Sequence, residues 1–360
     1  MNQRQKEQQQ FELSGENLVV GEMEKCPIDL EQLASTTSDS PYVVETFQSG
    51  LTAEVFRLRF AGKDYTLKKK RPVAKVQNLD GQFSFLNEVQ RRADLQRHKD
   101  NPATSDAFEC IVPTVYADYR LGIILSEWIE AEPISKITHS LLEQLFSTLT
   151  ACERIGLFEW DLCAGNLLVD ANGKLWLFDF GYMYRFDPLN ELNSNGMSDP
   201  LFELCERFET RFLSGWFLEQ GYSISQSLSV FRKVKRQALK ALTLHFEWLQ
   251  NQNASKPVLM AKRQQITDYQ IALANERKLK QLFEVEMFRS HVLDIEDDLA
   301  GRSCTPTTIK RVEAVLAMIK DAYPMLNEKG ALFYHNHGKN QAELIDSYQT
   351  ALSLVKQYQI

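Results

Sequence analysis

The hydrophobic and polar positions in the first part of the chain alternate as they do in short β-strands. Residues 55–60 alternate between apolar and polar side chains, residues 61–64 are typical of a turn, and residues 65–68 form a second strand-like run. This pattern predicts a β-hairpin. Residues 82–97 are rich in helix-forming types, and residues 121–125 form an apolar run typical of a buried strand. We therefore expect a small β-rich region that contains one helix.

Beyond residue 140 the spacing of apolar residues becomes helical. The apolar side chains between Leu141 and Ile155 recur at steps of 3 and 4, which places them on one helical face, and Gly156 follows as a plausible C-cap. Almost everything after Asp199 also reads as helix, and the polar stretch Ala261–Phe288 suits an exposed or extended helix. The pattern predicts an α+β protein with a small β-rich part and a large helical part.

Composition and charge narrow the class of protein. The chain has 360 residues, 44% hydrophobic and 25% charged, which is typical of a soluble globular protein. Its net charge of −7 argues against a nucleic-acid partner. The six cysteines show no C-x-x-C spacing, the N-terminus is polar, and no apolar run is long enough to span a membrane. These features favour a cytoplasmic protein without a transmembrane segment, and they leave its oligomeric state open.

The chemistry is concentrated around a second predicted hairpin. An Asn-Gly pair at residues 172–173 separates two apolar runs, which should pair as antiparallel strands. Asn166 stands just before the first run and Asp179 just after the second, so the hairpin should make them neighbours. Two oxygen donors at one strand end suit a Mg²⁺ ion that shares its shell with phosphate. Asp161, on the loop that enters the hairpin, can face the same point.

This arrangement resembles the protein-kinase superfamily. Asp161 and Asn166 have the spacing of the H-R-D-x-x-x-x-N catalytic loop, and Asp179, Phe180 and Gly181 spell the D-F-G that follows it. The resemblance implies a two-lobed protein-kinase-like fold that binds ATP and Mg²⁺. It implies that Asp161 orients or deprotonates an acceptor hydroxyl, and that Asn166 and Asp179 hold the metal ions that bridge the phosphates.

The N-terminal half supplies the parts that would bind the nucleotide. The segment that ends at Lys68 resembles the V-A-I-K strand, which makes Lys68 the candidate for holding the α- and β-phosphates, with Thr66 on the same face. Lys69 or Lys70 takes this role instead if the strand register slips. Glu88 lies at a suitable distance for the Lys–Glu ion pair of the superfamily, although a surface helical glutamate reads equally well.

Two further segments fit the resemblance less closely. Aligning Val55 with the valine of the glycine-rich loop places Gly50 at the second glycine, whereas Gln48 and an alanine stand at the first and third. Residues 49–52 can still turn so that backbone N–H groups approach phosphates. The segment around Glu127 and Ile129 resembles the hinge, where their backbone groups would meet the adenine edge, and a plain buried strand is the alternative.

Departures from protein kinases point to a different acceptor. Trp160 replaces the arginine that precedes the catalytic aspartate, and no A-P-E segment follows D-F-G. The chain therefore looks closer to phosphotransferases resembling aminoglycoside, choline or lipopolysaccharide-sugar kinases. We expect a loosely ordered arm over residues 1–41, a kinase-like N-lobe over 42–127 and a helical C-lobe over 128–360, in which the loop 187–200 helps to hold the acceptor.

The sequence thus predicts an enzyme, an ATP- and Mg²⁺-dependent phosphotransferase that moves the γ-phosphoryl group to a hydroxyl of a small molecule or saccharide. Three alternatives stay open. The chain could phosphorylate serine or threonine in a protein acceptor, bind nucleotide as a pseudokinase scaffold, or transfer AMP as kinase-like nucleotidyl transferases do. The order of the motifs does not separate γ-phosphoryl transfer from AMP transfer.

Overall fold

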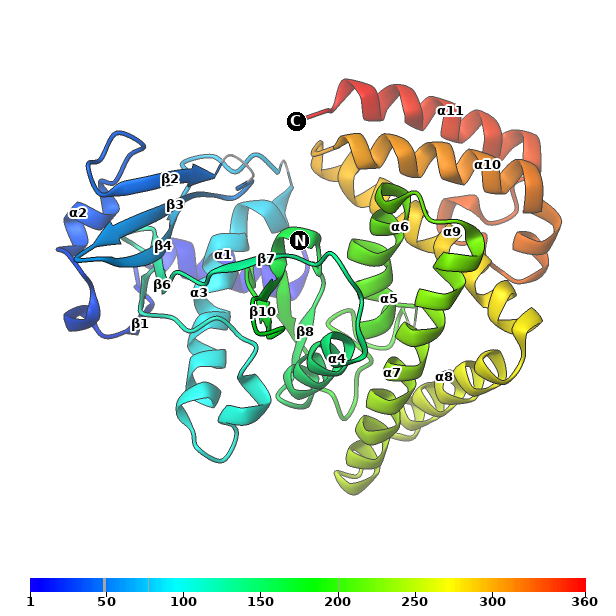
Figure 1. The fold of residues 1–360 in the computed structure, drawn as a ribbon, viewed down its shortest axis with the longest axis horizontal. Coiled ribbons are helices and arrows are strands. Elements are labelled where there is room, and N and C mark those ends of the chain that lie inside the picture. The colour runs from blue at the N-terminus through cyan, green and yellow to red at the C-terminus, as the bar shows by residue number, and fades with distance from the viewer. Residues whose placement is uncertain (48–49, 77, 200) are drawn as a thin grey trace. The chain divides into compact units, whose positions relative to one another are not determined.

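The computed structural model describes residues 1–360 except 48–49, 77 and 200. The chain divides into two compact units. The first unit comprises Met1–Ile134 and Gly165–Tyr184, and the second comprises Ser135–Ala164 and Arg185–Ile360. An antiparallel sheet dominates the first unit and helices dominate the second (Figure 1), which confirms the predicted α+β class.

The main sheet of the first unit contains the first predicted hairpin. Phe60 and Lys63 are joined by a tight turn in which Ala61 and Gly62 both adopt positive φ, at 49° and 80°. The sheet is antiparallel with the strand order β1-β5-β6-β4-β3-β2. Its strands are β1 (Val19–Gly21), β2 (Val43–Phe47), β3 (Ala53–Phe60), β4 (Lys63–Lys70), β5 (Tyr116–Asp118) and β6 (Ile123–Glu127).

Both faces of this sheet are covered, so alternate side chains of β4 enter different cores. Tyr65 and Leu67 point into a cluster beside the short helix α2 (Leu30–Ala34). The opposite face packs against α3 (Leu79–Asp100), the helix expected at residues 82–97. Because successive strand residues alternate between faces, Thr66 and Lys68 lie on the α3 side.

The N-terminal segment, for which a loosely ordered arm was expected, contains a helix and a strand. It forms α1 (Gln3–Ser14), which begins with a capping box between Asn2 and Gln5, and it adds β1 to the edge of the sheet. Polar contacts hold α1 in place, among them an ion pair of 2.9 Å between Arg4 and Asp80. The helix has no apolar stripe, so the periodicity that reveals a helix in a sequence is missing here.

The second predicted hairpin is confirmed. It consists of β9 (Leu167–Asp170) and β10 (Leu175–Leu177), and β7 (Ala131–Pro133) pairs with the outer side of β9. The Asp170 carboxylate accepts the backbone N–H groups of Asn172 at 2.8 Å and Lys174 at 3.0 Å, which closes the turn. The short strands β8 (Leu157–Glu159) and β11 (Met183–Arg185) flank this region in the sequence.

The second unit is helical, as the spacing after residue 140 predicts. The polar stretch Ala261–Phe288 forms two helices that break at Asn275, whereas one exposed or extended helix was expected. The Asn275 side chain accepts the N–H of Lys278 at 3.1 Å and so caps a new helix. The helices are α4 (His139–Arg154), α5 (Leu204–Phe208), a π-helical turn (Glu209–Leu213), α6 (Ser214–Gln220), α7 (Ile224–Asn251), α8 (Lys256–Ala274), α9 (Glu276–Gly301), α10 (Pro306–Glu328) and α11 (Gln341–Gln357).

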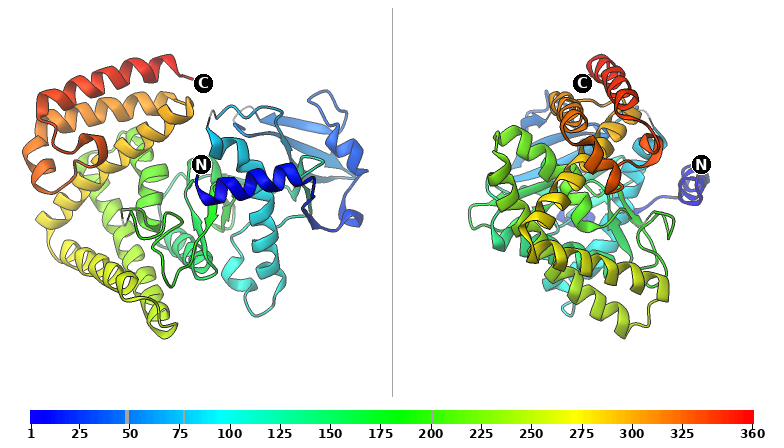
Figure 2. Two further views of the ribbon diagram at one scale, coloured as in Figure 1. Left: turned by 180° about the vertical axis from the view of Figure 1, so that it is seen from behind. Right: turned by 90° about the vertical axis from the view of Figure 1, so that its right-hand side faces the viewer.

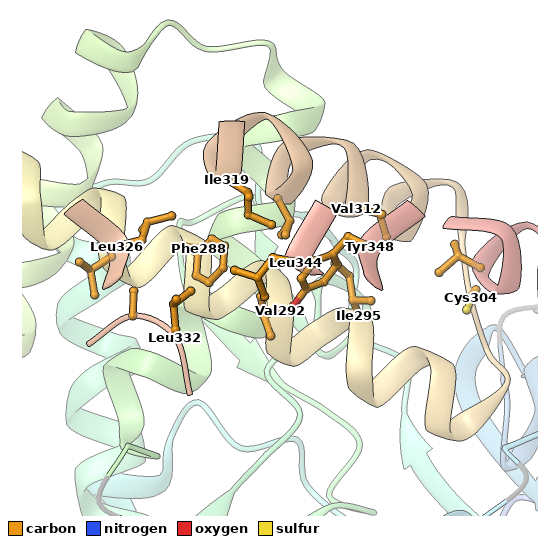
Figure 3. Packing of buried hydrophobic residues seen from close by; sticks show 14 residues of the cluster. Phe288, Val292, Ile295, Cys304, Val312, Ile319, Leu326, Leu332, Leu344 and Tyr348 are labelled. Atoms are coloured by element: carbon orange, nitrogen blue, oxygen red, sulfur yellow. The ribbon is translucent and has the colours of Figure 1, made fainter. Parts of the chain in front are cut away.

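The last three helices share one core. In Figures 1 and 2, α11 runs beside α10. Figure 3 shows Phe288, Val292 and Ile295 of α9 facing Ile319 of α10 and Leu344 of α11. All of these side chains are buried, so this part of the chain has an apolar interior of its own. Within the described residues, no helix combines the length and apolar character that crossing a membrane requires.

Candidate active site

Lys68 is the centre of a charged cluster in the first unit. Its Nζ lies 2.8 Å from Oε2 of Glu88 on α3 and 2.8 Å from Oδ2 of Asp179. The Lys68 side chain is only 12% exposed. Burial lowers the pKa of the ammonium, but the carboxylates of Asp179 and Glu88 outweigh this effect and raise that pKa above its usual value. The Lys68 side chain is therefore protonated and positively charged.

The register of β4 places Lys68 here and leaves its two neighbours elsewhere. Lys68 lies opposite Val55 on β3 and Ile124 on β6. Lys69 instead donates to the backbone of the N-terminal segment, and Lys70 donates to the Tyr119 hydroxyl at 2.9 Å. Among the three candidate lysines, Lys68 is thus the one whose ammonium meets Glu88.

Glu88 is held from two sides by cations. Its second oxygen, Oε1, is 3.0 Å from Arg92 one helical turn later, and Arg92 also donates to the Ser126 hydroxyl at 2.9 Å. Glu88 and Arg92 are both 3% exposed. Sequence reasoning did not single out Arg92, although the i, i+4 spacing of a glutamate and an arginine was a readable signal.

Asp179 follows directly after the second hairpin and has unusual backbone geometry. Its φ is +59°, in the left-handed region. The Asn87 amide on α3 donates to the backbone oxygens of Phe180 at 3.2 Å, Gly181 at 3.0 Å and Met183 at 2.8 Å, which fixes the segment after Asp179. Sequence reasoning also missed Asn87, because a single helical asparagine carries no local signal for such distant partners.

The charge of Asp179 is stabilised by its neighbour. Burial raises the pKa of the Asp179 carboxyl, but the attraction and hydrogen bond of Lys68 more than offset this and hold that pKa below its usual range. The carboxylate is 36% exposed, so it remains accessible to ligands. An ionised, accessible carboxylate is a suitable oxygen ligand for a hard cation.

The hairpin brings the segment of Asn166 to that of Asp179, as predicted. Leu167 pairs with Leu177, and the N–H of Phe178 donates to the carbonyl oxygen of Asn166 at 3.0 Å. Within the described ranges, no group of three or more His, Cys, Asp or Glu side chains could hold a metal ion. A site here would need the amide oxygen of Asn166 and ligand oxygens to complete it.

The remaining nucleotide-binding candidates lie in the first unit. Gly50 lies where the backbone approaches itself closely, because a Cβ atom on this residue would come within 2.2 Å of the Ala53 carbonyl oxygen. Its own carbonyl accepts from Arg71 at 3.0 Å. Val55 is half-buried on β3, and Thr66 is half-buried on β4. The positions Gln48 and Ser49 of the predicted glycine-rich turn lie outside the described residues, as does Pro200, which was expected to open a helix.

The predicted hinge begins where β6 ends. The Trp128 N–H donates to the Asp64 carbonyl at 3.1 Å, and Glu127 faces Tyr65 across the sheet. In an antiparallel pair, bonded and non-bonded positions alternate, so the backbone N–H and C=O of Glu127 point away from β4. This orientation is the one that an adenine edge would require. The half-buried Ile129 follows outside the strand.

Asp161 belongs to the second unit and is engaged in a buried charge network there. Its Oδ1 accepts the Nε–H of Arg211 at 2.9 Å, and its backbone N–H donates to Glu159 at 2.7 Å. Arg211 comes from the π-helical turn Glu209–Leu213 and is also ion-paired with Asp294 on α9. Burial opposes the charge on Arg211, but these carboxylates raise its pKa well above the usual value.

From the sequence alone, the acidic run at residues 294–298 is typical of a solvated helix end, with a surface for a cationic acceptor as the alternative. Asp294 is instead 7% exposed and lies 2.8 Å from Arg311 as well as next to Arg211. It serves as a buried partner of two arginines, of which Arg211 orients the Asp161 carboxylate.

Trp160 shows what replaces the usual arginine before this aspartate. Its indole N–H donates to the Ser194 hydroxyl at 2.8 Å, and its ring packs edge-on against Phe202 with centroids 4.9 Å apart. The Arg207 guanidinium lies 5.3 Å from the centre of the indole ring. Trp160 thus ties the loop of Asp161 to the segment that follows the second hairpin and to α5.

Comparison with known proteins adds a family resemblance to this geometry. A stretch of 44 residues is 54% identical to uncharacterized proteins from two strains of Mycobacterium tuberculosis, CDC 1551 / Oshkosh and H37Rv. That stretch is 12% of this chain and covers only 9% of the length of each relative. Residues 53–197 match the ABC1 atypical kinase-like domain. This span includes Lys68, Glu88, Asp161, Asn166 and Asp179, and the match supports the protein-kinase-like superfamily and the kinase-like α+β fold.

Proposed function

We propose that the chain is an ATP- and Mg²⁺-dependent phosphotransferase that moves the γ-phosphoryl group to a hydroxyl acceptor. The observation that carries this proposal is the convergence of Lys68, Glu88 and Asp179 in the first unit, with both carboxylates 2.8 Å from the lysine. A lysine held by a helical glutamate next to the D-F-G aspartate is the arrangement that kinase-like enzymes need for phosphoryl transfer.

The nucleotide would be held mainly by the first unit. Lys68 would pair with the α- and β-phosphates while Glu88, itself fixed by Arg92, keeps the ammonium in position. Gly50 would let the backbone approach the phosphates, with Val55 and Thr66 beside the base and ribose. The outward-facing backbone of Glu127, followed by Ile129, would bind the adenine edge.

The residues present fit a magnesium ion, which prefers hard oxygen ligands and commonly shares its shell with phosphates. Asp179 and Asn166 would hold it, since Asp179 is ionised and the hairpin brings the two segments together. When bound, the ion supplies neutralisation of the charge on the phosphates. Lys68 adds a second, fixed positive charge to the same task.

The acceptor would be handled by the second unit. Asp161 would accept the hydrogen bond or proton of the attacking hydroxyl, and Arg211 keeps its carboxylate in one orientation. Trp160 stands where protein kinases carry the arginine that reads activation-loop phosphorylation, so we infer no control of that type. The absence of an A-P-E segment after D-F-G, on which protein kinases dock peptides, supports a small-molecule or saccharide acceptor, as in the aminoglycoside, choline and lipopolysaccharide-sugar kinases.

Labelled nucleotide tests the reaction. ATP labelled in turn at the α and γ positions should transfer only the γ label to acceptors in a cell extract, as read by mass analysis. Transfer of the α label would establish AMP transfer instead. ATP with Mg²⁺ should raise the melting temperature of the wild type, and Asp161→Ala should keep that shift but lose transfer. A wild type without any nucleotide-induced shift would refute the proposal as a whole.

The acceptor class needs a separate test. Asn193 is fully buried, and its amide donates to the carbonyl oxygens of Asp199 and Phe202, both at 3.1 Å, so it anchors the loop after the second hairpin. Trimming Asn190–Asn195 should therefore impair transfer to the natural acceptor more than basal ATP hydrolysis. Strong phosphorylation of casein that survives this deletion would favour a protein kinase.

Nucleotide binding without transfer is the second candidate. The observation that favours it is the 2.9 Å contact between Asp161 and Arg211, because this ion pair already occupies Oδ1 of the carboxylate that an acceptor hydroxyl would have to meet. A scaffold of this kind would show the melting shift with ATP and transfer neither label. The same labelling experiment therefore separates the two candidates.

A further inference from the structure

The second unit contains a cavity of about 470 Å³. Its walls come from the segment that leads into α5, from α8 and from α9, and they include the apolar side chains of Leu201, Phe202 and Leu282. A volume of a few hundred Å³ is typical of sites for small molecules. None of the residues to which we assign nucleotide binding lines this cavity.

A second, small recess of about 20 Å³ shares two residues of the wall. Glu203 and Lys262 line both the recess and the large cavity. Inside the recess, Nε2 of His245 lies 3.4 Å from Oε2 of Glu153. The other polar atom of each side chain, Nδ1 of His245 and Oε1 of Glu153, has no hydrogen-bond partner among the described residues. The recess therefore holds two unsatisfied polar atoms, and it has room for one water molecule.

The acidic groups of the large cavity already have partners. Glu203 accepts from the Tyr269 hydroxyl at 2.7 Å, and Glu206 lies 2.8 Å from Arg207. Glu286 is ion-paired with the fully buried Lys235. The carboxylates that line the cavity from α5 and α9 are thus engaged by the protein itself, and the exposed Asp268 of α8 accepts from the Gln264 amide at 2.9 Å.

Two cationic side chains in the walls lack such partners. Lys262 is only 6% exposed, yet it makes no hydrogen bond or ion pair with any described residue. The Nε–H of Arg289 is buried without an acceptor in the described part of the chain, although its Nη2 donates to the Gly330 carbonyl at 2.7 Å. The buried Nε–H of Arg289 is costly to leave without an acceptor, and together with the unpaired Lys262 ammonium in the same cavity wall it points to an anionic group that the protein does not supply.

Glu153 compensates the charge of Lys262 only in part. Burial raises the pKa of the Glu153 carboxyl to about 7, although the nearby Lys262 ammonium acts in the opposite direction. Near neutral pH this carboxyl is therefore partly protonated, so it offsets the charge of Lys262 only in part. Replacing Lys262 with an apolar residue of similar shape should then stabilise the free protein.

We propose that this cavity binds a small molecule with an anionic head group, a phosphate or carboxylate, and an apolar body. Lys262 and Arg289 hold the head group, and the body contacts Leu201 and Phe202. Because Phe202 packs on Trp160, next to Asp161, a bound molecule would rest against the wall that supports the candidate catalytic loop. The binding itself needs neither ATP nor any part of the proposed reaction.

Four probes with the same eight-carbon chain test the head group: octyl phosphate, octanoate, octylammonium and octanol. Titration calorimetry on the full chain should show one binding site for the two anions, with octanol at least tenfold weaker and octylammonium weaker still. Tighter binding of octyl phosphate would identify a phosphate head group, and tighter binding of octanoate a carboxylate. Equal affinity for all four probes, or a preference for octylammonium, would overturn the proposal.

Variants locate the site. Lys262→Met should weaken both anions at least tenfold, leave octanol unchanged and raise the melting temperature, whereas Lys262→Arg should retain the anions. Lys256→Met is the matched control, since Lys256 is exposed at the start of the same helix. Gln265→Trp should fill part of the cavity and weaken every probe while leaving Lys262 in place. Unchanged anion binding in both Lys262→Met and Gln265→Trp contradicts the site.

Discussion

Replacing Glu88 with glutamine removes the charge that joins β4 to α3. The glutamate has a 4% exposed side chain and contacts two cations, Lys68 at 2.8 Å and Arg92 at 3.0 Å. Removing one partner of a buried ion pair typically costs about 3–5 kcal/mol. The glutamine keeps an amide oxygen for one donor, and Lys68 keeps Asp179, so we expect a loss near the lower end, about 3 kcal/mol.

Urea unfolding measures this loss, and an exposed ion pair supplies the control. Arg71 and Glu54 are 3.5 Å apart, and the Glu54 side chain is 43% exposed, so Glu54→Gln should change the free energy of unfolding by less than about 1 kcal/mol. Glu88→Gln should also reduce the rise in melting temperature that ATP produces, because Lys68 loses one of its two anchors.

The result that refutes this reasoning is a Glu88→Gln protein as stable as Glu54→Gln. In that case the contacts of Glu88 with Lys68 and Arg92 add no net stability. A double variant, Glu88→Gln with Arg92→Met, refines the test. If the unpaired arginine causes most of the loss, the double variant should recover part of the stability that the single variant loses.

Three other predictions concern titration and orientation. Lys68 holds the pKa of the Asp179 carboxyl below its usual 3.8, so this group stabilises the folded protein above about pH 4. That stability is lost as pH falls through the lower pKa of the folded state. Asp179→Asn should therefore lose less free energy of unfolding at acid pH than the wild type, as measured by urea unfolding. Burial raises the pKa of Glu153 from 4.5 to about 7, so the contribution of this group to the free energy of unfolding falls as pH rises between these two values. Glu153→Gln should thus be near neutral at about pH 4 and stabilising by up to about 3 kcal/mol at about pH 8, and equal effects at both would exclude this titration. Arg211→Met should lower the rate of transfer at least tenfold without reducing the ATP-induced rise in melting temperature, and Arg211→Lys should recover part of the lost transfer. Unchanged transfer in Arg211→Met would exclude the orienting role.

Local signals account for what the sequence revealed about the fold. The hairpin between Leu167 and Leu177 follows from the Asn-Gly turn and two flanking apolar runs, which are features of neighbouring residues. The alternation in β4 likewise placed Lys68 on the face of α3. The helix α1 and the break at Asn275 escaped prediction because polar contacts and a cap create them, and neither changes the apolar periodicity.

The site shows the same division between local and distant causes. The spacing of Asp161, Asn166 and Asp179 was readable because these residues stand close together in the sequence. Arg211 was not, because it reaches Asp161 from 50 positions away through a helical turn of unusual geometry. Asn87 meets the segment after Asp179 across a separation of 93 to 96 positions. Such partners depend on tertiary structure and leave no short motif.

The π-helical turn Glu209–Leu213 makes the length of the chain matter as well as its residue types. It joins α5 to α6 without a break and holds one residue more than an α-helical turn would. Deleting a single residue there would let one α-helix run through, but it would rotate the two flanking segments by about 100° relative to each other. Glu209 then could not face Lys235 while Ser214 keeps its contact with Arg311. A deletion that leaves every charged side chain in the sequence would therefore still break one of two buried contacts, Glu209 with Lys235 or Ser214 with Arg311, on either side of Arg211.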